Sequence, residues 1–223
     1  MLHTFTPNMV SRALDFLRQL KVNNNRDWFA AHKDTYLEIN KEINDFAEQM
    51  ILNISQFDDL GNISAKDCTY RIYRDIRFSA DKSPFKTHIG VYICKGGKNS
   101  ELAGYYIHFE PGNCMVAGGV WCPSKENLEY IRRYIYNDPQ SYLNVINQKT
   151  FADNFAMMDD KLKTAPKGYP KDFEYIDLIR YKSFSPYKIL TDEEFCADNF
   201  VDNITRCLSY LSPYIKYLNN ILE

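Results

Sequence analysis

The chain has 223 residues, of which 45% are hydrophobic and 15% aromatic, a composition that suits a packed core and excludes a disordered chain. Its formal net charge of −2 lacks the basic excess that general nucleic-acid binders carry, so such binding is not expected. No apolar run is long enough for a membrane span, the start of the chain lacks a secretory signal pattern, and the six cysteines form no CxxC pair. We therefore expect one cytoplasmic domain over residues 1–223, with free thiols and no membrane contact.

Residues 1–60 carry helical patterns. Apolar residues recur every three or four positions before and after the run NNNRDWF, which predicts two helices with a break between them. Thr6 is the expected cap of the first helix, and Pro7 suits its first turn. Asn24 or Asn25 is the expected cap of the second, which ends before the polar turn FDDLGN.

Residues 67–122 are expected to form a sheet, because their hydrophobic period changes to two. The segments CTYRIYRDIRF, HIGVYICK, GYYIHFE and CMVAGGVW read as four strands, and their short connections make them mostly antiparallel. The turn EPGN joins the last two strands into a hairpin that pairs Phe109 with Cys114.

Residues 124–223 are expected to be mostly helical. Ser124 caps one helix, and DPQSYLNVI, TFADNFAMMDDKL and DFEYIDLIR read as shorter ones, whereas YKSFSPYKIL could return a strand to the sheet edge. The last helix is predicted from TDEE, where Thr191 and Glu194 fit a capping box, and Pro213 should kink it. This order predicts an α+β fold: a mainly antiparallel sheet of about four to five strands, covered by helices from both ends of the chain.

The hairpin register predicts two unlike faces. One is a core face, formed by Tyr105, Ile107, Phe109, Cys114, Val116 and Val120. The other carries small residues flanked by aromatic ones: Gly104, Tyr106, His108, Met115, Ala117, Gly119 and Trp121. Such a shallow aromatic floor suits a ligand or a packed helix, and the helix is the favoured occupant because sheets of this kind usually need covering.

Charge is concentrated in YRIYRDIRFSADKSPFK, residues 70–86. In an extended chain Arg74 falls on an apolar face, where a guanidinium is costly unless its donors are satisfied. Two interpretations stay open: an ion pair with a buried acid, or a pocket in which the arginine binds phosphate or carboxylate. We expect a mixed outcome, in which an acid holds Arg74 while Arg77 and Lys82 face a cleft.

The candidate ligand-binding residues come from segment 71–86 and from the hairpin. They are Arg74, Asp75, Arg77, Ser79, Asp81, Lys82, Lys86, Tyr106 and His108. The cations would bind an anion, and Asp75 or Asp81 would orient them or act as a base, although a merely solvated loop is the alternative. The four histidines lack metal-ligand spacing, and the chain has no phosphate-binding glycine loop, nucleophile elbow or HExxH, so neither a metal nor a cofactor is expected.

Four segments, taken in order, resemble the bacterial proteins catalogued as domain-of-unknown-function family 2461. They are FLRQLKVNNNRDWFAAHKDTY, RIYRDIRFSADKSPFKTHIG, GYYIHFEPGNCMVAGGVWCP and PKGYPKDFEYIDLIRYKSF, which together span nearly the whole chain. The resemblance favours a single domain but implies no activity and no catalytic residues. It places the family's hallmark residues between Arg74 and Lys86, where Phe85 stands in place of a common tyrosine and offers no hydroxyl for acid–base chemistry.

The sequence therefore predicts a protein that binds a small anionic ligand, either a phosphate ester or a carboxylate, through segment 71–86. Turnover of that ligand stays an open question. The alternative is a non-catalytic module whose basic loop and exposed aromatic residues dock a protein or a nucleic acid.

Overall fold

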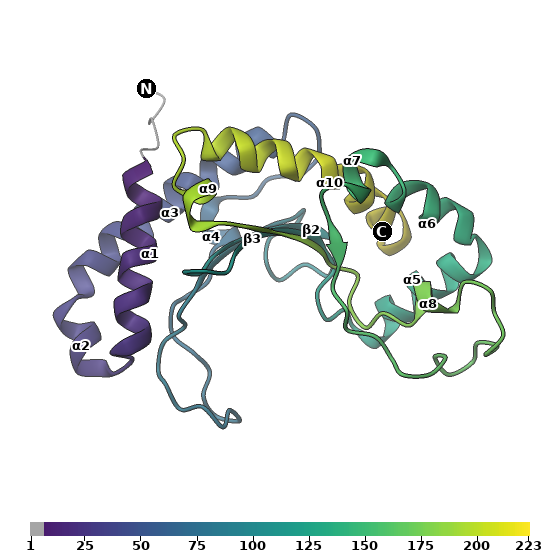
Figure 1. Ribbon diagram of the computed structural model, residues 1–223, viewed down its shortest axis with the longest axis horizontal. Helices are drawn as coiled ribbons and strands as arrows, with labels where there is room; N and C mark the ends of the chain where they lie inside the picture. Colours follow the sequence, from purple (N-terminus) through teal and green to yellow (C-terminus); the bar gives the residue numbers. More distant parts are fainter. Residues whose placement is uncertain (1–6) are drawn as a thin grey trace.

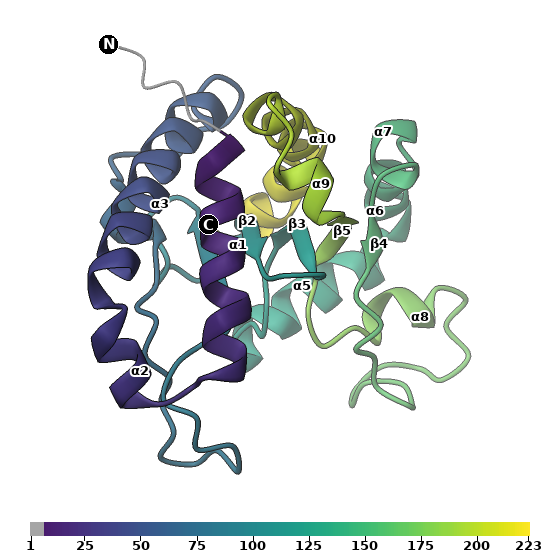
Figure 2. The same ribbon diagram turned by 60° about the vertical axis from the view of Figure 1, so that its left-hand side comes forward.

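The computed structural model describes residues 7–223, which form ten helices and a five-stranded antiparallel sheet (Figure 1). The predicted α+β fold is confirmed. Figures 1 and 2 show the sheet in the middle of the molecule, with the N-terminal helices beside it and α10 (Phe200–Leu222) lying across it. The expected cap Thr6 lies outside the described residues.

The N-terminal part contains α1 (Pro7–Val22), α2 (Arg26–Ala31) and α3 (Lys33–Ile54). The break in the asparagine run is confirmed, with Asn25 as a cap: its side chain accepts a hydrogen bond of 2.9 Å from the amide of Trp28. Asn25 caps only α2, however, so the predicted second helix is divided at His32 and its longer part, α3, starts anew at Lys33. A short helix, α4 (Ala65–Cys68), follows after a capping box made by Ser64 and Asp67.

The sheet has the order β1-β2-β3-β5-β4. Its strands are β1 (Ile89–Ile93), β2 (Gly104–Phe109), β3 (Cys114–Gly119), β4 (Ala156–Met157) and β5 (Pro186–Leu190). The C-terminal strand β5 does return to the sheet, but it lies between β3 and the two-residue β4 and is therefore not the edge strand that the sequence predicted.

The predicted hairpin register is confirmed, because Ile107 pairs with Val116 and His108 with Met115. All six residues of the predicted core face are buried. They pack under α3 and α10: Phe46 of α3 meets Phe109 edge-on, and Leu211 of α10 lies above Gly118.

The opposite face of the hairpin is not covered by a helix, which contradicts the favoured expectation. It lines a cavity of about 580 Å³, and the only helical residues among the described part of the chain that line this cavity are Tyr36, Asn40 and Ile43 of α3. The helices of the C-terminal part pack on the core face or beyond the edge of the sheet. The opposite face of this sheet therefore stays open.

The C-terminal helices are α5 (Lys125–Asn137), α6 (Pro139–Ile146), α7 (Lys149–Ala152), α8 (Ile176–Ile179), α9 (Asp192–Phe195) and α10. The predicted caps are confirmed at Ser124 and in the Thr191–Glu194 capping box. That box caps only the start of α9, however. The last helix, α10, starts separately at Phe200 and continues through Pro213.

Two further helix predictions were too long. The segment TFADNFAMMDDKL is helical only to Ala152, since Ala156 and Met157 pair with β5 as an edge strand. DFEYIDLIR is helical only within α8. Strand pairing with a distant segment overrides the local helical pattern in the first case.

The first predicted strand, CTYRIYRDIRF, is not part of the sheet. The capping box at Ser64 and Asp67 keeps the chain helical to Cys68, and residues 69–88 then form an irregular arm with isolated bridges between Tyr73 and Phe85 and between Thr69 and Val91. The charged side chains of the arm bond to one another and to its own backbone, as described below, so no strand ladder forms there.

No helix within residues 7–223 combines the length and the apolar composition needed to cross a bilayer. All six cysteines are unpaired thiols. Burial raises the pKa of the Cys68 and Cys114 thiols to about 12, so both stay protonated at neutral pH.

Gly119 ends β3 at a point where only glycine fits. Its φ is +100°, and a Cβ there would lie 2.0 Å from the carbonyl oxygen of Phe184. Gly119→Ala should therefore lower the free energy of unfolding by more than the roughly 1–3 kcal/mol of backbone strain alone, measured by urea denaturation.

Gly112→Ala is the matched control, because Gly112 also has a positive φ (+73°) but a Cβ there would have no atom within 4 Å. It should lose only about 1–2 kcal/mol. Equal losses in the two variants would show that the contact with Phe184 does not constrain this strand end.

Candidate functional site

The cavity beneath the open face of the sheet is called the sheet pocket below. Its floor is made by side chains on the open face of β1, β2 and β3, among them Tyr92, Tyr106, His108 and Met115. Residues of the arm and of the loop after β1 form one wall, α3 forms another, and Trp121 lies at the rim, 61% exposed. The predicted aromatic floor is therefore present and accessible.

Two glycines shape this floor. A Cβ at Gly90 would lie 2.6 Å from the hydroxyl oxygen of Tyr106, and a Cβ at Gly104 would lie 2.9 Å from Cζ of Tyr92. Because both positions lack a side chain, the two tyrosine rings can lie across the neighbouring strands. The hydroxyl of Tyr92 donates to the carbonyl of Leu102 at 2.9 Å, which fixes that ring.

A chain of hydrogen bonds holds the polar part of the floor. The Tyr106 hydroxyl lies 2.8 Å from Nδ1 of His108, whose Nε2 lies 3.2 Å from a carboxylate oxygen of Glu110. The same oxygen accepts 2.7 Å from the Asn113 amide. Because an ionised carboxylate can only accept, the neutral His108 imidazole carries its proton on Nε2, which faces Glu110. Its Nδ1 therefore accepts a hydrogen bond from the Tyr106 hydroxyl. Burial lowers the pKa of His108, although Glu110 opposes the shift, and burial raises the pKa of Tyr106.

His88 lies directly before β1 and also lines the pocket. Its ring stacks on that of His108 with centroids 4.8 Å apart. Its ring nitrogens make no hydrogen bond within residues 7–223. Burial, followed by the neighbouring His108, lowers the pKa of His88 to about 4, so its imidazole is neutral at physiological pH.

The arm and the loop after β1 place three cations in the pocket lining: Arg71, Lys86 and Lys98. The ammonium of Lys86 donates to the carbonyl of Arg71 at 3.0 Å, and the Lys86 and Lys98 nitrogens lie 5.4 Å and 6.0 Å from the ring centroid of Tyr70. Burial and the charge of Arg71 lower the pKa of Lys86. None of the three cations forms an ion pair with a carboxylate in the described part of the chain.

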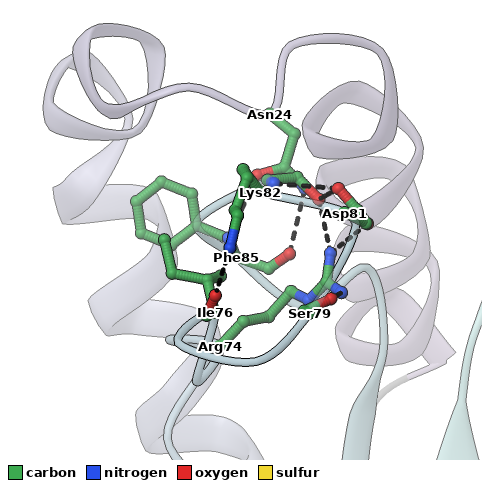
Figure 3. Close-up of polar contacts among 8 residues, drawn as sticks. Asn24, Arg74, Ile76, Ser79, Asp81, Lys82 and Phe85 are labelled. Atoms are coloured by element: carbon green, nitrogen blue, oxygen red, sulfur yellow. Dashed lines mark hydrogen bonds and ion pairs between the residues drawn. The ribbon is translucent and has the colours of Figure 1, made fainter.

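Residues 74–83 form a charged loop at the tip of the arm, and Figure 3 shows how its side chains close it. The guanidinium of Arg74 donates to the carboxylate of Asp81, to the Ser83 hydroxyl at 2.5 Å and to the Ser79 hydroxyl at 3.3 Å. The ammonium of Lys82 donates to the carbonyl of Ile76 at 2.9 Å.

The remaining contacts of the charged loop are equally local. Arg77 pairs with Asp75 at 2.6 Å and is 77% exposed. At the base of the loop, the side-chain amide of Asn24 bonds both backbone groups of Phe85, at 3.0 and 3.1 Å (Figure 3). Phe85 is buried and stacks on Phe29, so a hydroxyl at this position would point into the core.

The predicted site residues therefore fall into two groups. Lys86, Tyr106 and His108 line the sheet pocket. The other six do not line it: Arg74, Asp75, Arg77, Ser79, Asp81 and Lys82 belong to the charged loop. We expected an acid to hold Arg74 while Arg77 and Lys82 face a cleft. An acid, Asp81, does pair with Arg74. Arg77 and Lys82, however, line neither the sheet pocket nor a smaller cavity of about 430 Å³ beside Arg74.

Sequence reasoning missed Arg71, His88 and Lys98 as site residues. Arg71 lies at the start of the charged segment, and His88 begins the predicted strand HIGVYICK without any motif around it. Lys98 lies in a glycine-containing turn that carries no motif. Only the folded arm brings the three into one cavity.

No group of three or more histidine, cysteine or acidic side chains within residues 7–223 is arranged to hold a metal ion. The pocket's cations can donate hydrogen bonds, and His88 can donate one and accept one. Glu101 also lines the pocket, and its carboxylate accepts hydrogen bonds from Ser124 and Asn127. This donor and acceptor set suits recognition of a polar anionic group next to an aromatic surface.

Residues 12–217 match the model of the family described as "Conserved hypothetical protein (DUF2461)". The chain belongs to this family. No curated protein and no solved structure matches the chain.

Replacing Arg74 by alanine tests whether this arginine forms a buried ion pair, which is one of the two interpretations that the sequence left open. Its partner Asp81 is 61% exposed, so water can solvate the carboxylate when the guanidinium is absent. Arg74→Ala should therefore lower the free energy of unfolding by about 1 kcal/mol or less in urea denaturation.

Arg77→Ala, which removes the exposed pair with Asp75, serves as the matched control and should have a similarly small effect. A loss of roughly 3–5 kcal/mol for Arg74→Ala alone, the cost of an uncompensated buried charge, would contradict this description of the loop.

Proposed function

We propose that this member of the DUF2461 family binds a small anionic ligand in the sheet pocket. The anionic group lies against Arg71, Lys86 and Lys98, and the uncharged part of the ligand lies over the aromatic floor. This proposal keeps the ligand class that the sequence suggested and moves the site from the tip of segment 71–86 to its two ends.

The observation that carries the proposal is the distribution of counter-charges. In the charged loop each arginine has its own aspartate: Arg74 has Asp81, and Arg77 has Asp75. In the pocket no carboxylate among the described residues lies within 4 Å of the charged groups of Arg71, Lys86 or Lys98, although Asp67 and Asp75 interact with Lys98 and Arg71 over longer distances and Glu101 also lines the pocket. The lowered pKa of Lys86 reflects burial and repulsion by Arg71. A bound anion would relieve both effects.

The dimensions of the pocket support a small molecule. A volume of about 580 Å³ lies within the range of about 300–1,000 Å³ that is usual for ligand sites. The floor offers the rings of Tyr92 and Tyr106, so a ligand with a flat or apolar part would bury more surface than a free inorganic ion.

We further propose that the protein acts in the cytoplasm. The support is the state of its cysteines: all six are unpaired, and four of them are buried, which suits a reducing compartment.

A second candidate function uses the charged loop as a docking element for a protein or a nucleic acid. The observation that favours it is Phe78, which is 97% exposed at the tip of a loop held by its own side chains. The guanidinium of Arg77 lies 6.0 Å from its ring centroid. An exposed ring beside a cation can stack on a base or meet an acidic peptide.

Calorimetric titration with inorganic phosphate tests the pocket. Arg71→Ala and Lys86→Ala should each weaken phosphate binding by roughly tenfold or more, since each removes a charge-assisted hydrogen bond. Arg77→Ala, which removes a cation of the same arm outside the pocket, should leave phosphate affinity unchanged. Loss of binding in Arg77→Ala with normal binding in Lys86→Ala would place the anion on the loop instead.

Fluorescence anisotropy with a labelled single-stranded oligonucleotide and a labelled polyglutamate peptide tests the second candidate. Docking through the loop predicts binding that Phe78→Ser abolishes and Lys86→Ala leaves intact. No binding of either probe by the wild-type protein would remove support from the docking function.

A further inference from the structure

We propose that the sheet pocket binds a nucleotide, with the nucleobase stacked on Trp121 and the phosphate against the cations at the other end of the cavity. This inference rests on the proposed function and adds the class of ligand to it. Three features of the cavity support it: an uncovered ring at the rim, an anchored backbone beneath that ring, and two ends of opposite charge.

The first feature is the uncovered ring. Trp121 lines the pocket at its rim, is 61% exposed and pairs with no other aromatic ring within residues 7–223. The other tryptophan, Trp28, lies outside the pocket and stacks on His32 with ring centroids 4.0 Å apart. An indole beside a ligand cavity with no ring of the protein against it offers a flat surface on which a nucleobase can stack.

The second feature is the backbone that carries this ring. Val120 exchanges two hydrogen bonds of 3.0 Å with Phe184, and the amide of Cys122 donates to the Ser183 hydroxyl at 3.0 Å. Cys122 also has a φ of +49°, which no other non-glycine residue within residues 7–223 matches with a positive value. Such a conformation persists only where the surrounding contacts hold it. The backbone on both sides of Trp121 is therefore ordered before a ligand binds, which lowers the entropy cost of binding.

The third feature is the difference in charge between the two ends of the cavity. The cations belong to the arm and to the loop after β1. The Lys86 and Lys98 nitrogens lie 5.4 and 6.0 Å from the ring centroid of Tyr70, and the carbonyl of Arg71 accepts the hydrogen bond from Lys86. This end of the cavity therefore suits the phosphate.

The Trp121 end carries a negative charge instead. Glu101 lines the pocket, and one of its carboxylate oxygens accepts hydrogen bonds of 3.2 and 2.8 Å from Ser124 and Asn127. Both of these residues follow Trp121 closely in the chain. The carboxylate repels a phosphate at this end and can accept a hydrogen bond from the amino group of a base. The charges thus orient the ligand, with its base towards Trp121.

The separation of the two ends requires an extended ligand. Thr69 of the arm bridges to Val91 of β1, so the arm, β1, β2 and β3 lie side by side in this order. Strands lie about 4.8 Å apart, so the backbones of the arm and of β3 are roughly 14 Å apart. Trp121 follows directly after the end of β3 and Val120. A free phosphate ion cannot contact both ends, whereas a nucleotide joins a flat base to a phosphate through a sugar.

Calorimetric titration with adenosine 5′-monophosphate (AMP) and with ribose 5-phosphate tests this inference, because the two ligands differ only in the base. AMP should bind the wild-type protein roughly tenfold more tightly or better, which is within the effect of stacking one base. In Trp121→Ser the affinity for AMP should fall to that for ribose 5-phosphate, which should stay unchanged. Phe78→Ser is the matched control, since Phe78 is an exposed ring outside the pocket, and it should keep the preference for AMP.

A measurement on the unaltered protein makes the test independent of variant folding. The chain has two tryptophans, so its NMR spectrum should contain two indole N–H resonances. AMP should shift the resonance of Trp121 and leave that of Trp28 in place, and ribose 5-phosphate should shift neither. An unchanged Trp121 resonance in protein saturated with AMP would contradict stacking on this ring.

The two proposals fail in different ways. Equal affinities of the wild-type protein for AMP and ribose 5-phosphate, both lost in Lys86→Ala, would overturn the nucleotide inference and leave the anion pocket standing. A preference for AMP that Trp121→Ser retains would do the same. No binding of AMP, ribose 5-phosphate or inorganic phosphate by the wild-type protein would overturn both.

Discussion

The pairing of Ile107 with Val116 and of His108 with Met115 decides which face of the sheet is packed. With a side-chain period of two, this register sends the apolar residues of β2 and β3 under α3 and α10. It leaves Tyr106 and His108 on the other face, where the pocket lies. A shift of one residue would bury the polar side chains and expose the core, so fold and pocket depend on the same constraint.

The charges of the arm have two different roles that the sequence alone does not separate. At the tip, Arg74 pairs with Asp81 (Figure 3) and Arg77 pairs with Asp75, and these ion pairs neutralise the charges of the loop. At the two ends of the arm, Arg71 and Lys86 reach the pocket without a carboxylate partner among the described residues. The open face, the aromatic floor and these unpaired cations occur together in one cavity, which is why the anion site is proposed there.

Features that depend on neighbouring residues were predictable. The cap at Asn25, the Thr191–Glu194 box and the β2–β3 register all follow from local spacing, and the structure has each of them. The arm was not predictable in this way: its alternation of two resembles a strand, but the short helix before it and the pairing of Arg74 with Asp81 keep it out of the sheet.

The candidate site shows the same division. The position of Tyr106 and His108 on the open face of the sheet followed from the register. That the floor stays open depends on where distant helices pack, which no local pattern gives. The convergence of Arg71, Lys86 and Lys98 depends on how the arm is placed, with Thr69 bridged to Val91 of β1 and Tyr73 to Phe85, and no local pattern predicts these bridges.

A crystal structure of the protein soaked with inorganic phosphate tests the central claim most directly. The account predicts phosphate in the sheet pocket, in contact with Arg71 and Lys86. Phosphate bound only at Arg77 or Lys82 of the charged loop, with the pocket holding water alone, would contradict it.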